Sequence, residues 1–210
     1  MEKTRANSPY IDLMRPGSFV GAVLTASGIN NALIVFHGIA GCNIEAVHFR
    51  SDQVPGGGYV PIIPTGLNEH DCIQGGNEKL LRTLRDTIAQ AQKRKRPSDV
   101  VFVLTSDATS IVGDDITNAA KLVENETGVK VVALDTPGFL GGTAKGVDTA
   151  LTALLRRFAA NEGNSGQKTG VNIIAPYLMG SKNWINDNDE IVRLLQGAGI
   201  AVNTVFTRNF

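Results

Sequence analysis

The feature that most constrains the fold is a regular alternation of short apolar runs with amphipathic stretches. Five runs are nearly continuous and mostly β-branched, at residues 33–36, 99–104, 129–134, 171–175 and 200–205. Such runs are typical of strands that are buried on both faces. Between them, apolar residues recur at helical spacing in residues 17–28, 77–95, 114–125, 145–160 and 187–198. The alternation predicts a three-layer α/β fold, in which helices flank a parallel, Rossmann-like sheet.

A polar, glycine-rich stretch at residues 161–167 divides this pattern and is typical of a linker. We therefore expect a first domain over residues 15–160 and the beginning of a second, similar α/β domain over residues 168–210. Two strands and one helix cannot bury both faces of a sheet. The second domain is accordingly expected to be truncated, or to take its remaining cover from another chain.

Charge and composition argue against several classes of protein. Lys+Arg and Asp+Glu number 20 each, so the chain has no net field with which to bind nucleic acid or an anionic membrane. No segment approaches the roughly 20 apolar residues that span a bilayer. The first ten residues lack the apolar core of a signal peptide. Two cysteines are too few for a disulfide framework, so a reducing cytoplasm is the expected compartment.

The segment His37–Asn43 follows a predicted strand and contains the chain's first cysteine, Cys42. Its glycines allow a sharp turn and the close approach of a ligand. A thiol in the first turn of the next helix lies near backbone N–H groups, which favour the thiolate form that binds metals. Cys42 is therefore a candidate ligand, although a lone cysteine is as often a small buried hydrophobe. Neither Cys72 with His70 nor Cys42 with His48 has the further partners of a zinc site.

Three more polar loops, at residues 67–80, 104–116 and 135–143, join predicted elements. Two of them follow the carboxyl ends of predicted strands, where open α/β sheets bind their ligands. We expect Asn77 to cap the long helix that follows the first loop, as Ser18 caps the first helix of the chain. Asp114 and Asp115 are expected to cap the next helix and to compensate its dipole. No glycine cluster matches a dinucleotide or phosphate-loop fingerprint.

Taken in order, these motifs resemble the nitrogenase component 1 family. That family includes the molybdenum-iron protein subunits, their cofactor-assembly scaffolds, the protochlorophyllide and chlorophyllide reductases and the nickel-tetrapyrrole reductive cyclase. The resemblance covers nearly the whole chain and rests on the following positions: residues 21–24, 27–29, 37–42, 67, 71, 75–76, 111–116, 136–139, 146, 171–174, 190–191, 194–195, 199–200 and 202–203. It corresponds to the N-terminal portion of the family's fold.

The resemblance also implies a cofactor and its ligand positions. In the family, paired subunits enclose an iron–sulfur cluster that is held by three cysteines from each subunit. The corresponding positions here are Gly17, Cys42 and Asp107, so only the middle position is a cysteine. A carboxylate can ligate iron, although thiolates are the usual cluster ligands. Cys72 is not at a family ligand position and is expected to be a packed residue.

The resemblance implies a subunit of a nitrogenase-like oxidoreductase that is active only with partners. Electrons would pass from an ATP-dependent iron protein through a cluster shared with a homologous subunit, in a homo- or hetero-oligomer. Cys42 would ligate this cluster, and Asp107 would be a ligand or a polar neighbour that tunes its potential. The loss of two cysteines leaves two alternatives open. One is a non-catalytic scaffold that holds a metal cluster or a tetrapyrrole, and the other is a cluster-free homologue that acts through protein contacts.

Overall fold

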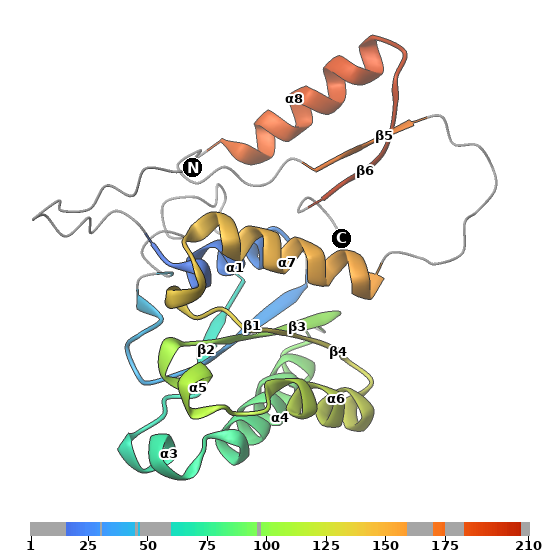
Figure 1. Cartoon of the computed structure of the whole chain (residues 1–210). Coiled ribbons are helices and arrows are strands. Elements are labelled where there is room, and N and C mark those ends of the chain that lie inside the picture. Colours follow the sequence, from blue (N-terminus) through green and yellow to red (C-terminus); the bar gives the residue numbers. More distant parts are fainter. Residues whose placement is uncertain are drawn as a thin grey trace, which may run out of the picture.

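The computed structural model describes residues 16–29, 31–44, 46, 60–95, 98–158, 170–174 and 183–206 (Figure 1). Two groups of elements follow one another along the chain. The first group is α1 (Ser18–Ser27), β1 (Ala32–His37), β2 (Ile62–Pro64), α3 (Glu69–Gln74), α4 (Asn77–Lys93), β3 (Val100–Thr105), α5 (Asp107–Val112), α6 (Ile116–Thr127), β4 (Lys130–Leu134), η1 (Gly138–Leu140) and α7 (Thr143–Phe158). The second is β5 (Gly170–Ile173), α8 (Trp184–Gly197) and β6 (Ala201–Val205).

The first group forms a parallel sheet with helices on both faces, as the sequence pattern predicts. Its strand order is β2-β1-β3-β4, and every neighbouring pair is parallel. Helices α1 and α7 cover one face, and α4 and α6 cover the other (Figure 1). Alternate residues of β3 explain the two layers, since Phe102 packs toward α1 and α7 whereas Val101 and Val103 pack toward α4 and α6. The predicted three-layer α/β fold is thus confirmed.

Helices α1 and α7 touch backbone to backbone at two glycines. A Cβ atom built on Gly21 would lie 1.9 Å from the carbonyl oxygen of Thr143, and one built on Gly146 would lie 1.8 Å from that of Ser18. Neither position has room for a side chain. The predicted cap by Ser18 is wrong, because Gly17 is the N-cap and the Ser18 hydroxyl donates to the Pro137 carbonyl at 2.7 Å. Tertiary contact with the loop after β4 has replaced the local cap.

Strands β5 and β6 pair in parallel and form a separate two-stranded sheet. Helix α8 connects them, as the sequence pattern predicts (Figure 1). Apolar side chains are exposed on this unit, among them Val171 of β5, Leu194 of α8 and Ile200, just before β6. Ile185 of α8 is half-buried and packs against the core beneath α1 and α7.

Four short elements were not expected from the sequence, namely β2, α3, α5 and η1. Each has at most six residues, too few to establish a period. The predicted cap by Asn77 is wrong, because Gly76 is the N-cap of α4 and no side chain caps it. The Asn77 Oδ1 atom is instead buried without a hydrogen-bond partner among the described residues. Within that part of the chain, no helix is long and apolar enough to cross a membrane.

Candidate cofactor site

The loops that follow β1, β3 and β4 lie together because parallel strands end at one edge of the sheet. The carbonyl of His37, at the end of β1, accepts hydrogen bonds from Ser106 N and Thr109 Oγ1 at 3.0 and 2.9 Å. These two residues belong to the first turn of α5, where Ser106 and Thr109 form a capping box. The β1 loop, which contains Cys42, is thereby joined to the helix that begins at Asp107.

Cys42 lies on an exposed turn at this edge of the sheet. Its backbone N–H donates to the Ile39 carbonyl at 3.2 Å, and Ile44 N donates to the Gly41 carbonyl at 3.1 Å. Gly41 has a φ of +93°, which a residue with a side chain rarely adopts. Cys42 was expected in the first turn of a helix and lies instead in the turn before the helical residues Ile44 and Ala46. The thiol is accessible to a ligand or a partner.

Asp107 is the first residue of α5 and is exposed. Its carboxylate accepts a hydrogen bond from Gly138 N. Gly17 contacts the same glycine, because a Cβ built on Gly17 would lie 3.2 Å from the Gly138 Cα atom. Gly17 also forms an antiparallel bridge with Gly142. The structure therefore brings Gly17 and Asp107 together on the Gly138–Gly142 loop.

A second carboxylate, Asp135, lies at the end of β4 among hydroxyl groups. One oxygen accepts from Thr105 Oγ1 at 2.7 Å and from Ser110 Oγ at 2.6 Å. The Ser110 hydroxyl also lies 3.0 Å from Thr105 Oγ1, which accepts from Thr136 N at 2.8 Å. These bonds tie the loops after β3 and β4 to each other. The hydroxyl-rich sequence after β3 was the only local signal for this cluster.

The most buried polar pair beside the site is His37 with Asp114. Their side chains are 0% and 2% exposed, and His37 Nε2 lies 2.9 Å from Asp114 Oδ2. Burial lowers the pKa of His37, and this outweighs the hydrogen bond and charge of Asp114, which raise it. The imidazole is therefore neutral at pH 7, with its proton on Nε2 facing the carboxylate.

The predicted capping role of Asp114 is wrong. Only Asp115 caps α6, accepting from Asn118 N at 2.9 Å. The Asp114 carboxylate turns inward, and Gly76 N donates to its two oxygens at 2.9 and 3.1 Å. It also lies beside Gly75, where the chain turns with a φ of +95°. No local pattern distinguishes these two adjacent carboxylates.

Large apolar side chains are exposed around Cys42 and Asp107. Ile73 of α3 is 83% exposed, Ile111 of α5 is 75% exposed and Phe139 of η1 is 61% exposed. Helices α3 and α5 are in contact with each other. We call this group, together with Ile39, Ile44 and Leu140, the apolar rim. Exposed apolar groups at one edge of a domain are typical of a protein–protein contact surface.

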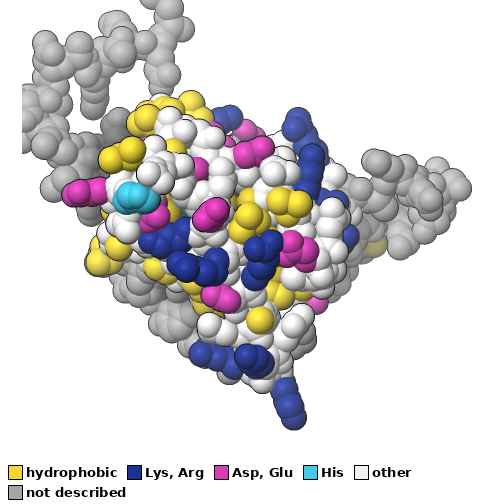
Figure 2. Space-filling model, turned by 90° about the horizontal axis from the view of Figure 1, so that it is seen from below, with side chains coloured by type: hydrophobic (Ala, Val, Ile, Leu, Met, Phe, Trp, Pro, Cys, Tyr) yellow, Lys and Arg dark blue, Asp and Glu magenta, His cyan; other side chains and the backbone are white. Residues whose placement is uncertain are grey.

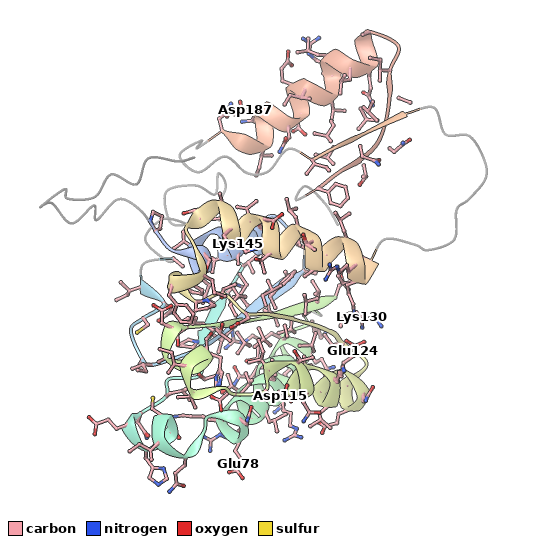
Figure 3. All side chains as sticks on the ribbon, in the orientation of Figure 1. Glu78, Asp115, Glu124, Lys130, Lys145 and Asp187 are labelled. Atoms are coloured by element: carbon pink, nitrogen blue, oxygen red, sulfur yellow. The ribbon has the colours of Figure 1, made fainter. Side chains whose placement is uncertain are left out.

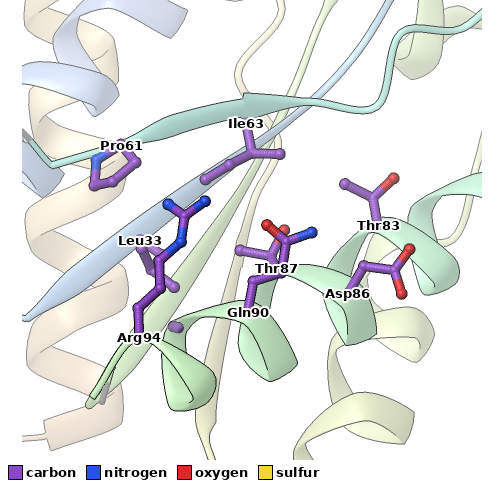
Figure 4. A pocket seen from close by; sticks show the side chains of 9 residues that line it. Leu33, Pro61, Ile63, Thr83, Asp86, Thr87, Gln90 and Arg94 are labelled. Carbon is purple, nitrogen blue, oxygen red and sulfur yellow. The ribbon is translucent and has the colours of Figure 1, made fainter. Parts of the chain in front are cut away.

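Two grooves differ in their relation to this edge. The first, of about 550 Å³, lies between α4 and the strands β1 and β2, with Leu33 and Arg94 at one end (Figure 4). Leu33 is near the amino end of β1, so this groove is distant from the strand ends that carry the site. The second, of about 910 Å³, is lined by Ile39, Asn68, Glu69, His70, Cys72 and Ile73. Cys72, expected to be packed, is only half-buried and lines this groove.

The surface charges agree with the balanced composition. On the face formed by α3, α4 and α6, Lys and Arg side chains are interspersed with Asp and Glu and with apolar groups (Figure 2). Several of these charges are paired, such as Arg85 with Glu126 at 2.7 Å and Lys79 with Asp71 at 2.8 Å. This face therefore carries interspersed charges of both signs.

Comparison with known proteins identifies the class. The family model described as nitrogenase component 1 type oxidoreductase matches residues 18–210. The chain therefore belongs to this family, as its ordered motifs indicate.

Its relatives include proteins named for cofactor biosynthesis and chains of the molybdenum-iron protein. A nitrogenase iron-molybdenum cofactor biosynthesis protein NifE from Clostridium pasteurianum is 27% identical over 171 residues, covering 81% of this chain and 36% of that protein. A nitrogenase molybdenum-iron protein alpha chain from Methanothermobacter thermautotrophicus is 30% identical over 205 residues, covering 90% and 42%. The solved structure "Nitrogenase Cp1 at pH 6.5" shares the fold, with a TM-score of 0.77 and 20% identity, covering 99% and 43%. The chain thus spans less than half the length of these relatives.

The side chains present fit a cluster only as part of a larger ligand set. Among the described residues, no group of three or more His, Cys, Asp or Glu side chains is placed to hold a metal ion. Cys42 offers an accessible, soft sulfur donor. Asp107 offers oxygen atoms, one of which accepts from Gly138 N, and Gly17 has no side chain. A four-iron cluster needs four ligands, so the remainder would have to come from outside this set of residues.

Proposed function

We propose that this chain is part of a redox subunit of a nitrogenase-like oxidoreductase. In this proposal it pairs with a homologous subunit and shares with it an iron–sulfur cluster that receives electrons from an ATP-dependent iron protein. The observation that carries the proposal is Cys42, which in a member of this family lies on an exposed turn at the edge of the sheet formed by the carboxyl ends of its strands. The apolar rim around it supports a subunit contact at the same edge.

Each residue has a defined part in this proposal. Cys42 supplies a thiolate ligand, and the cluster supplies one-electron transfer when it is bound. Asp107 supplies a carboxylate oxygen or remains a polar neighbour that tunes the potential. Two copies of this chain would bring two cysteines and two aspartates to the interface. A partner that kept all three family cysteines would instead complete four thiolates with Cys42.

A scaffold function is the second candidate. The similarity to a protein named for cofactor biosynthesis favours it, as does the absence of cysteine at two of the three family positions. A scaffold would hold a metal cluster or a tetrapyrrole and release it without turning over a substrate. A cluster-free homologue that acts by protein contact is the remaining alternative.

Iron and sulfide analysis after anaerobic purification tests the proposal. The chain should be co-expressed with the product of its neighbouring gene, and the complex isolated without oxygen. We expect iron and acid-labile sulfide in wild type and loss of most of both in Cys42→Ala. Cys72→Ala is the matched control and should retain both. Wild-type complex that contains no iron would rule out the redox and cluster-scaffold functions.

Reduction by an ATP-dependent iron protein then separates the two cluster-binding functions. A redox subunit should show an ATP-dependent change in the cluster's visible or paramagnetic resonance spectrum when this reductase is added. A scaffold should bind the cluster and transfer it to an acceptor without that ATP-dependent change.

A further inference from the structure

The buried pair of His37 and Asp114 joins three parts of the chain: the end of β1, the start of α4 and the segment before α6. The proposed function gives this pair no role. Asp114 precedes α6 and binds the backbone of Gly76, which begins α4. His37 ends β1 and is followed directly by the turn that carries Cys42. We propose that His37 and Asp114 are positioning residues, which hold the Cys42 turn in one conformation. The part of this proposal that concerns a cluster site rests on the proposed function. The effect of the pair on the conformation of the Cys42 turn can be measured in the chain without metal.

The connection from the pair to the turn consists of buried hydrogen bonds through Thr65. On the side opposite Asp114, His37 Nδ1 lies 3.2 Å from Thr65 Oγ1. That hydroxyl accepts from Gly38 N at 3.1 Å and lies 3.3 Å from the Gly38 carbonyl oxygen. The same carbonyl accepts from Leu67 N at 2.9 Å. The first residue of the turn is therefore held through Thr65, and Thr65 is held by the imidazole.

The packing of the pair and of the turn leaves no room for a side chain at two positions, Gly76 and Gly38. A Cβ on Gly76 would lie 2.9 Å from both Asp114 Oδ2 and His37 Cε1. A Cβ on Gly38 would lie 2.6 Å from the Phe36 ring and 2.9 Å from the Ser106 Cβ atom. A methyl group at either position would force the pair or the turn to move.

The placement of Asp114 has no local explanation, which favours a positioning role. The helix that follows it already has its cap in Asp115. A buried carboxylate must recover the cost of desolvation from directed hydrogen bonds, and packed apolar residues of similar size would often be as stable. Asp114 has three such contacts, two with Gly76 N and one with His37, and these contacts fix the geometry of the α3–α4 connection relative to β1.

Hydrogen exchange with a matched control tests the proposal. Asp114→Ala and Asp115→Ala should be compared in the full chain carrying Cys72→Ser, so that Cys42 is the only thiol. In Asp114→Ala we expect amide exchange in residues 38–44 to accelerate by about tenfold, with exchange in α1 and α7 unchanged. The alkylation rate of Cys42 by iodoacetamide should change severalfold in the same variant. Asp115→Ala should alter exchange in α6 and leave residues 38–44 and Cys42 as in wild type.

A second variant distinguishes the loss of the His37–Asp114 hydrogen bond from general misfolding. Asp114→Asn keeps an oxygen that can accept from Gly76 N but presents an N–H to His37 Nε2. We expect the His37 proton to move from Nε2 to Nδ1, detected in the imidazole ¹⁵N chemical shifts, with exchange at residues 38–44 between wild type and Asp114→Ala.

Two results would overturn the positioning role. One is equal acceleration of exchange in α1, α7 and residues 38–44, which would make Asp114 a general stability residue. The other is unchanged exchange and alkylation at the turn in both Asp114 variants. Either result is independent of the iron analysis, so failure of this inference and failure of the proposed function are distinguishable.

Discussion

Glu124 shows how one side chain can join three elements. It lies on α6, and its carboxylate accepts from Val131 N at the edge strand β4 at 3.1 Å. Lys130 of β4 donates to it at 3.3 Å, and Arg157 of α7 also donates to it. Figure 3 shows Glu124 and Lys130 close together at this edge of the sheet. A side chain that satisfies an open strand edge also protects that edge from pairing with other chains.

The ionisation of Glu124 predicts a pH-dependent contribution to stability. Burial raises its pKa, but the hydrogen bonds from Val131, Arg157 and Lys130 together lower it by a larger amount. The net pKa is therefore below the ordinary 4.5. A lowered folded-state pKa means that the stabilisation is complete above pH 4.5 and is lost as the pH falls through the folded value.

Glu124→Gln should therefore reduce the free energy of unfolding near neutral pH and have a progressively smaller effect in acid. Urea denaturation of both proteins between neutral pH and about pH 3 measures the difference. A difference that stays constant across this range would show that Glu124 acts through packing or neutral hydrogen bonds alone.

At the scale of elements, the contact of α1 with α7 depends on glycine. Gly21→Ala and Gly146→Ala should each destabilise the protein by roughly 3 kcal/mol, because the added methyl would overlap the backbone of the other helix. The fall in urea midpoint measures the loss. Gly197→Ala, in α8 with no atom within 4 Å of the added Cβ, is the control. It should be neutral or stabilise by about 0.5–1 kcal/mol, since alanine favours helix.

This contact also affects the candidate site. The segment that joins η1 to α7 pairs with the start of α1 through Gly17 and Gly142. Ser18 N donates to the Gly141 carbonyl at 3.0 Å, and Thr143 N donates to the Pro16 carbonyl at 3.1 Å. A wider separation of α1 and α7 would therefore move Gly17 relative to Gly138 and Asp107. If Gly21→Ala leaves the urea midpoint unchanged, the close contact of the two helices is not a determinant of this geometry.

At the scale of the whole molecule, we propose the domain boundaries that the sequence indicates, residues 15–160 and 168–210. The first range contains both layers of the core around the four-stranded sheet, as the described residues place them. A protein of residues 15–160 should thus unfold cooperatively in urea. It should lose only about 1–2 kcal/mol relative to the full chain, mainly through Ile185, which packs on the first core. Absence of a cooperative transition would show that the boundary is wrong.

Some parts of the candidate site could be predicted from local sequence patterns, and other parts depend on tertiary contacts. The turn that carries Cys42 was predictable, because glycines and a cysteine after a buried strand form a local pattern. The capping role of Asp115 was equally local. The inward position of the Asp114 side chain was not predictable, because its partners Gly76 and His37 are 38 and 77 residues away in the chain. The contact of Gly17 with Gly138 was hidden for the same reason.

The sequence by itself determined the layered α/β fold, the order of its long elements and the family. Burial on both faces of a parallel sheet requires continuous apolar runs, and helices that cover such a sheet require a 3.6-residue period, so both leave readable patterns. Tertiary structure alone decided which glycines admit a neighbouring backbone, and which of two adjacent carboxylates caps a helix. Both depend on contacts between segments distant in the chain, for which no local period exists.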